Sequence, residues 1–216
     1  MGNSGNEPPS DAVHLLERLR AGDRGALAEL FQRHRDRLHR MVELRLDERL
    51  RGRIDASDVL QDGFLDLAKR VESYLRDPRL PVFLWLRLVV SDRLALVHRH
   101  YLGTRMRDAA QEVSLHRDRL PQASSAALAS MLLGRHTSPT QAAQRAERLL
   151  RIQEALNTLD PIDREVLALK HFEELSRAET AEVLGISPEA AAKRYFRALK
   201  RLKEVLASMP GGWEGI

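Results

Sequence analysis

Basic side chains gather along the last predicted helix of the chain. Between Lys193 and Lys203 the sequence carries six basic residues and no acidic residue. Four of them fall on one side of a helix that turns by about 100° per residue, with Arg194 at their border: Lys193, Arg197, Lys200 and Arg201. A one-sided cationic face suits the closely spaced phosphates of a nucleic acid, so we expect these side chains to hold DNA phosphates.

The residues before this face predict a helix-turn-helix. Ser176 and Glu179 have the spacing of a capping box, which begins a short helix. Gly185 can take the left-handed conformation that ends that helix. Ser187 and Pro188 then form a cap followed by a first-turn proline, as at the start of a second helix. Two helices joined by so short a turn are typical of DNA-binding proteins.

The second helix of such a motif enters a major groove with its first turn against the base edges, and basic residues behind it meet the backbone. A basic face can instead be merely solvated, but the capping devices and the one-sided charge together favour DNA binding. The predicted DNA-binding residues of this motif are Ser187, Glu189, Ala190, Lys193, Arg194, Arg197, Lys200 and Arg201.

A second group of charged residues is acidic. Asp55, Asp58, Asp62 and Asp66 follow the i, i+3, i+7, i+11 spacing that puts side chains on one helix face. A metal site is disfavoured because these carboxylates line about 16 Å of one helix, with no histidine nearby to complete a ligand set. The face is either solvated or a contact for a basic partner.

The elements that position these residues are all predicted to be helices, since the apolar residues recur at a helical period and no alternating strand is found. Helix stops are expected at Ala21-Gly22 and Asp77-Pro78, and helix starts near Asp55 or Ser57 and at Asp160-Pro161. The second helix has an apolar stripe made of Leu27, Leu30, Phe31, Leu38 and Val42.

Changes in composition divide the chain into two helical domains. We expect a disordered tail over 1–9, a domain over 10–102, a flexible linker over 103–137, a helix-turn-helix domain over 138–208, and a tail over 209–216. A short helix at ALASMLL is allowed within the linker. A coil of this length spans roughly 30 Å, so the two domains could reach separate sites on DNA.

Composition excludes several classes of protein. The chain has no cysteine, which rules out disulfides, Cys-ligated zinc and thiol catalysis and fits a reducing cytoplasm. It has no apolar run that could cross a membrane and no N-terminal secretion signal. His98 and His100 lie about 200° apart on a helix and cannot share a metal; we expect them to be surface or backbone-binding residues. No cofactor is expected.

The ordered motifs resemble the sigma-70 family of bacterial transcription initiation factors, in its extracytoplasmic-function (ECF) group. The stretch from about Ala146 to Leu206 is similar to region 4; it includes DREVL at 163–167, the helix-turn-helix, and the run from Arg194 to Leu202. LAELFQRHRDRLHRM at 27–41 and DASDVLQDGFLDL at 55–67 look like regions 2.1 and 2.2. FLWLRLVVSDRLALVHRH at 83–100 looks like regions 2.3 and 2.4.

The resemblance implies a non-enzymatic subunit that binds core RNA polymerase and directs it to promoters. It implies contacts with the β′ clamp coiled coil and the β flap, and it allows an anti-sigma factor as a further partner. The acidic face with its neighbour would meet the clamp: Asp55, Asp58, Gln61, Asp62 and Asp66. Region 4 would read the upstream promoter element, and Arg87, Arg93 and Arg99 would face the downstream element.

Two departures from the family pattern bear on specificity. The frequent asparagine seven residues after the tryptophan is Asp92 here, and the early valine and lysine of the recognition helix are Ala191 and Ala192. An alternative function is a stand-alone helix-turn-helix regulator, which would bind palindromic DNA as a dimer. A helical metal-dependent enzyme is disfavoured, since the histidines are scattered and form no cluster with aspartates.

Overall fold

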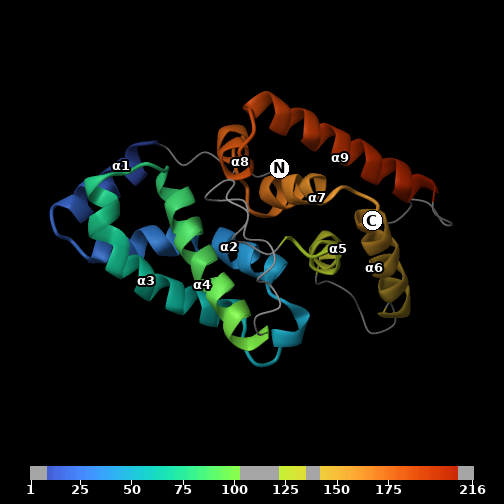
Figure 1. Ribbon diagram of the computed structural model, residues 1–216, viewed down its shortest axis with the longest axis horizontal. Coiled ribbons are helices and arrows are strands. Elements are labelled where there is room, and N and C mark those ends of the chain that lie inside the picture. The colour runs from blue at the N-terminus through green and yellow to red at the C-terminus, as the bar shows by residue number, and fades with distance from the viewer. Residues whose placement is uncertain (1–8, 103–121, 135–141, 209–216) are drawn as a thin grey trace.

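The computed structural model describes residues 9–102, 122–134 and 142–208. Its regular elements in these ranges are all helical, which confirms the all-α prediction for the part of the chain described. Helices α1 to α4 form one group and α6 to α9 a second, with α5 between them (Figure 1). None of the described helices is long and apolar enough to cross a bilayer.

The N-terminal group is a bundle of four long helices. It consists of α1 (Pro9–Arg20), α2 (Gly25–Arg45), α3 (Ala56–Arg76) and α4 (Val82–Leu102), with a 3₁₀ turn, η1 (Glu48–Leu50), after α2. The predicted stop between α1 and α2 is confirmed: Gly22 has a φ of 89°, a conformation that glycine adopts readily. Asp23 then accepts a hydrogen bond from the backbone N–H of Gly25 at 2.9 Å.

Helix α3 begins with a device that the sequence analysis did not recognise. The Asp55 carboxylate accepts the backbone N–H of Asp58, and the Asp58 carboxylate accepts that of Asp55, both at 2.9 Å. This capping box satisfies two N–H groups that a helix end otherwise leaves without partners. Two of the four aspartates of the acidic face therefore also fix the start of α3.

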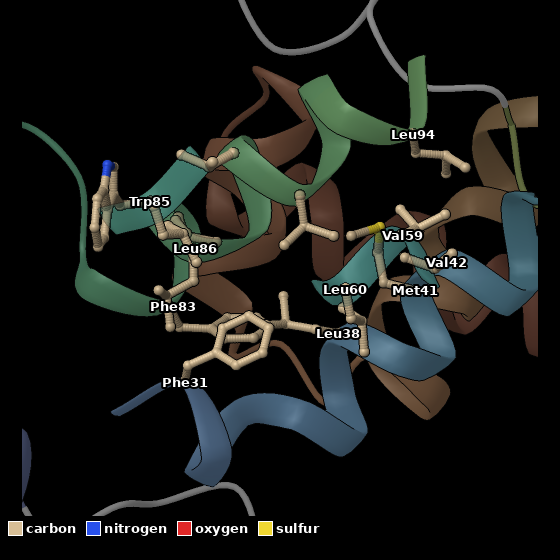
Figure 2. Close-up of a cluster of buried hydrophobic side chains, with 14 of the residues drawn as sticks. Phe31, Leu38, Met41, Val42, Val59, Leu60, Phe83, Trp85, Leu86 and Leu94 are labelled. Carbon is tan, nitrogen blue, oxygen red and sulfur yellow. The ribbon is translucent and has the colours of Figure 1, made fainter. Parts of the chain in front are cut away.

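The bundle core follows the predicted apolar stripes. Every residue of the α2 stripe is buried, and Leu86 and Leu94 of α4 have no exposed surface. Trp85 belongs to the same buried cluster (Figure 2). Its ring stacks on that of Tyr74 with centroids 4.3 Å apart, and Tyr74 is buried as well. At the α3–α4 crossing, a Cβ on Gly63 would lie 3.1 Å from Cγ2 of Val90, so glycine permits the close approach of these helices.

The C-terminal group contains the predicted helix-turn-helix. Its elements are α6 (Ala142–Asn157), α7 (Pro161–Leu167), η4 (Ala168–Phe172), α8 (Arg177–Leu184) and α9 (Pro188–Ser208). The start predicted at Asp160-Pro161 is confirmed, with the proline in the first turn of α7. Element η4 is a π-helix, a wider turn that continues directly from α7.

Helix α5 (Ser125–Leu133) lies inside the segment predicted as a linker. Its Ala127 and Leu128 are buried in a cluster with Ile152 of α6 and Leu202 of α9, and Leu44 of α2 joins the same cluster. This helix is therefore part of a core that involves both helical groups. Residues 103–121 and 135–137 of the predicted linker and the predicted tails, apart from Pro9, lie outside the described residues, and the domain boundaries stay a prediction.

Shortening a core side chain tests the packing of the bundle. We expect Leu86→Ala to lower the free energy of unfolding by roughly 2–5 kcal/mol, because it leaves a cavity where a fully buried side chain stood. Leu65→Ala on α3 is the matched control: Leu65 is 53% exposed, so the change should stay within about 0.5 kcal/mol. Urea unfolding followed by circular dichroism measures both, and equal losses would contradict the described core.

Candidate nucleic-acid interface

The turn between α8 and α9 is built by the predicted capping residues. Ser176 Oγ accepts the N–H of Glu179 at 3.1 Å, and the Glu179 carboxylate accepts the N–H of Ser176 at 2.8 Å. Gly185 ends α8 with φ 62° and ψ 37°, the left-handed conformation. Ser187 Oγ accepts the N–H of Ala190 at 3.2 Å and starts α9. The local geometry of a helix-turn-helix is thereby confirmed.

One side of α9 is fixed to the rest of the domain. Ala191, Ala198, Leu202 and Leu206 are buried and follow one another at helical spacing, so they form an apolar stripe along one side of α9. Tyr195 is half-buried, and its hydroxyl lies 3.0 Å from Nε2 of His171. The orientation of α9 is therefore set by its apolar side, which leaves the opposite side facing solvent.

That opposite side carries the cationic face. The first turn of α9 is also open, with Ser187 and Glu189 exposed and Ala190 half-buried. The exposed basic residues of the helix are Lys193, Arg197, Lys200, Arg201 and Lys203. Lys200 lies 3.8 Å from Glu204, an exposed pair that contributes little to stability. The side chains needed to meet a duplex are thus on one accessible surface.

Arg194 differs from the other predicted phosphate ligands. Its guanidinium lies 3.2 Å from the carboxylate of Asp163 on α7, and that of Arg197 lies 3.4 Å from the same oxygen. Asp163 is buried, so it needs a cationic partner. The Arg194 side chain is 32% exposed and that of Arg197 is 59% exposed. Arg194 therefore serves mainly to hold α9 on α7, whereas Arg197 keeps most of its surface for a ligand.

Phe196 is a residue that the sequence analysis missed. It is 65% exposed on α9, with its ring centroid 5.5 Å from that of Tyr195. Its position beside Lys193 and Lys200 on the helix surface puts an apolar ring at the edge of the cationic face. The sequence signal for Phe196 was an aromatic residue within a run of basic residues. Such a ring can contact a thymine methyl group in a major groove.

The acidic face of α3 is partly committed to contacts within the chain. Asp58, Gln61 and Asp62 are exposed, whereas Asp66 accepts a hydrogen bond from Nε of Arg93 at 2.8 Å. Burial raises the pKa of Asp66, but its contact with Arg93 outweighs this and holds the pKa below its ordinary value. The open part of the face is therefore Asp58, Gln61 and Asp62, together with Asp55 at the helix start.

The three arginines predicted to contact the downstream promoter element differ in their exposure. Arg99 is exposed near the end of α4, but Arg93 is turned toward Asp66 on α3. Arg87 is not open to DNA in this structure: its side chain is only 6% exposed because it pairs with the buried Glu173, Nε to Oε2 at 2.6 Å, and its DNA contact stays a prediction. The helical period places Arg87 on the same side as the buried Phe83 and Leu94, but it could not reveal the partner, which lies far along the chain.

The surface position expected for His98 is wrong. His98 is buried, and its Nε2 accepts the backbone N–H of Asp47 at 3.3 Å. Burial lowers the pKa of His98 and keeps the ring neutral at neutral pH, in agreement with its acceptor role. His100, by contrast, is exposed as expected. Among the described residues no group of His, Asp and Glu side chains could hold a metal ion.

A family model described as sigma-70, region 4, matches residues 149–202, from α6 to the middle of α9. Relatives match nearly the whole chain. The ECF RNA polymerase sigma factor SigD of Mycobacterium tuberculosis is 29% identical over 87% of this chain and 80% of its own. SigM of the same organism, also named an ECF RNA polymerase sigma factor, is 29% identical over 98% of this chain and 92% of its own.

The match over residues 149–202 and these relatives show a resemblance to the ECF group of the sigma-70 family. The stretch that matches region 4 contains the helix-turn-helix formed by α8 and α9, together with its cationic face. A solved structure, that of CnrH in complex with the cytosolic domain of CnrY, matches with a TM-score of 0.53 and 23% identity. It covers 91% of this chain and 97% of CnrH, and it supports the fold of both helical groups.

Two arginines on α9 test which side of region 4 meets DNA. We expect Arg197→Ala to reduce the slope of log affinity against log salt by about 0.9, because one phosphate contact is lost. Arg194→Ala is the matched control on the same helix, and its slope should not change because Asp163 holds that side chain. Fluorescence anisotropy on duplex DNA over a salt series measures both. A reduced slope for Arg194→Ala alone would mean that α9 is oriented differently.

Proposed function

We propose that the chain binds core RNA polymerase, directs it to promoters and contributes no catalytic chemistry of its own. The observation that carries this proposal is the exposed cationic face of α9, which lies within the stretch that matches sigma-70 region 4. The relatives that match over most of their length are named as RNA polymerase sigma factors, which supports the same function for both helical groups together.

Each of the two helical groups would contact DNA, and each would also contact the polymerase. The first turn of α9, with Ser187, Glu189 and Ala190, would read the upstream promoter element while the basic residues hold phosphates. Arg99 is the exposed candidate for the downstream element. The β flap of polymerase is the proposed site for region 4. An anti-sigma factor is a further proposed partner.

The open acidic face of α3 is the proposed contact for the β′ clamp coiled coil. Asp58, Gln61 and Asp62 are exposed along one side of α3, and a row of carboxylates favours a basic partner. Asp55 lies at the same edge, but its carboxylate also caps the helix. The polymerase-binding role of this face is therefore best tested at Asp62, which has no part in the cap.

Transcription with purified components tests the proposed function. Added to core polymerase, the chain should give specific starts on a subset of genomic fragments, because two weak DNA contacts on one polymerase gain effective concentration. Core polymerase alone is the control. A chain that binds core but yields no specific start on any fragment would contradict the proposal. Tight binding to palindromic DNA without polymerase would favour the stand-alone regulator.

A charge reversal on α3 tests the polymerase contact. We expect Asp62→Lys to weaken binding to core polymerase by about tenfold, close to 1.4 kcal/mol, because a cation would face a basic partner. Glu72→Lys is the matched control, since Glu72 is exposed on the same helix ten residues, about 15 Å, beyond Asp62. Biolayer interferometry with immobilised core measures both affinities. Equal effects would show that only net charge matters and would exclude a specific contact here.

A further inference from the structure

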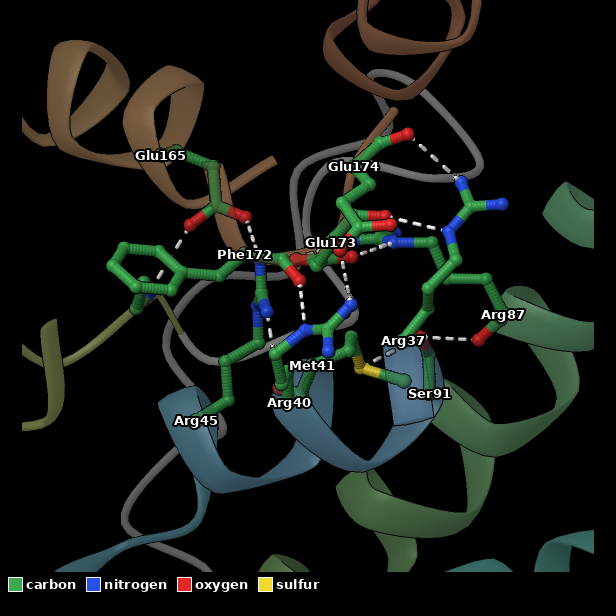
Figure 3. A network of polar contacts seen from close by, with 11 residues as sticks. Arg37, Arg40, Met41, Arg45, Arg87, Ser91, Glu165, Phe172, Glu173 and Glu174 are labelled. Carbon is green, nitrogen blue, oxygen red and sulfur yellow. Dashed lines mark hydrogen bonds and ion pairs between the residues drawn. The ribbon is translucent and has the colours of Figure 1, made fainter. Parts of the chain in front are cut away.

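The two helical groups are joined by a buried ion network that neither domain contains alone. Glu173, just after η4, lies between Arg45 of α2 and Arg87 of α4 (Figure 3). Its carboxylate is 2.6 Å from Nη2 of Arg45 and 2.6 Å from Nε of Arg87. The side chains of Arg45 and Glu173 have no exposed surface. Glu165 of α7 completes the network as a second partner of Arg45.

Two further arginines bind the backbone of the same turn. Arg37 donates from Nε to the carbonyl of Glu173 at 2.8 Å and from Nη2 to the carbonyl of Glu174 at 3.1 Å. Arg40 donates to the carbonyl of Phe172 and pairs with the Glu174 carboxylate at 2.6 Å. These carbonyls follow the end of a helix, where backbone acceptors lack partners within the helix and favour cations. We call Phe172–Glu174 the acidic turn and the four arginines, Arg37, Arg40, Arg45 and Arg87, the arginine cradle.

The shape of the acidic turn depends on an uncommon backbone conformation. Glu174 has a φ of 55°, and it is the one residue other than glycine with positive φ in the described ranges. Such a conformation is costly for a glutamate and persists only where surrounding contacts compensate for it. Here it follows the π turn of η4 and lets the carbonyls of Glu173 and Glu174 both meet Arg37.

The energetics of the network favour a contact that can open. Ion pairs buried from water gain little net stability, because the desolvation of each charge offsets the attraction. Removing one partner is far more costly, since it leaves a charge buried without compensation. Burial raises the pKa of Glu173, but Arg45 and Arg87 outweigh it and keep the pKa below its ordinary value, so the carboxylate stays charged. If the domains separate, water can solvate every charge.

The closed arrangement also covers positive charge on the N-terminal bundle. Arg45 and Arg87 are buried, and Arg37 and Arg40 are half-buried against the acidic turn. Arg87 is one of the residues that the sequence predicts to face DNA. The apolar contacts agree with one closed unit, because Val166, Leu169 and Leu175 belong to the same buried cluster as the bundle core.

We propose that the acidic turn is a releasable intramolecular clasp, which holds region 4 on the N-terminal bundle and must leave the arginine cradle before the chain engages polymerase and promoter. The clasp itself is a property of the free chain. Its regulatory role rests on the proposed function, because polymerase binding would select the open form. The apparent affinity for polymerase is then reduced by the fraction of chains that are open.

Energy transfer within the free chain tests the clasp without polymerase. The chain has no cysteine, so Lys69→Cys on α3 and Glu154→Cys on α6 give two exposed labelling sites. In the chain that carries only these two labels, we expect a single narrow distribution of the distance between them. Glu173→Gln should raise the open fraction at least tenfold, whereas Glu182→Gln on α8, the matched control, changes an exposed glutamate outside the acidic turn and should leave the open fraction the same. Circular dichroism confirms that the helices remain.

A second variant and a binding measurement complete the test. Arg87→Met keeps an apolar side chain of similar length and should also open the chain, because Glu173 loses one of its two cations. The affinity of Glu173→Gln for core polymerase should increase by the same factor as its open fraction.

Unchanged energy transfer in both variants, with helices intact, would overturn the clasp. Opening without any gain in affinity would overturn its regulatory role. Loss of polymerase binding in every variant and in the parent chain would contradict the proposed function instead, and energy transfer would still decide the clasp.

Discussion

The arrangement of the whole molecule depends on one buried carboxylate. Glu173 lies between Arg45 and Arg87, so a single residue of the C-terminal domain contacts two helices of the N-terminal bundle. Around this charge, arginines of α2 bind the carbonyls of the acidic turn, and the apolar cores of the two groups meet. Since a buried ion pair is specific in geometry but weak in net stability, it suits the releasable contact that we propose between the two helical groups.

Much of the fold could be predicted from local sequence. The capping box at Ser176 and the left-handed Gly185 are decided by neighbours a few residues away, and both form as predicted. The apolar residues of α2 and of α9 each share one helix face because they recur at the helical period, and both faces are buried. The first turn of α9 and its cationic face are exposed for the same reason, as the complement of a buried side.

What could not be predicted involves partners that are distant in sequence. Arg87 lies four residues after Phe83 and seven before Leu94, on the buried side of α4, but its charge partner Glu173 could not be inferred from the local sequence. His98 is buried because a backbone N–H of the loop after α2 needs an acceptor. The π turn of η4 and the positive φ of Glu174 have no local sequence signature, although they shape the acidic turn. For Asp55 and Asp58 the sequence prediction was incomplete. Their spacing predicted an acidic face, but the same two side chains also form the capping box of α3.

The two surfaces proposed for polymerase and DNA lie on different helical groups, with α3 in one and α9 in the other (Figure 1). A structure of the chain bound to core polymerase on promoter DNA tests this division of labour most directly. The account predicts that the first turn of α9 lies in a major groove, that the acidic side of α3 meets the polymerase, and that Glu173 no longer contacts Arg87. A complex in which α9 lies away from the duplex, or in which Glu173 remains between Arg45 and Arg87, would contradict it.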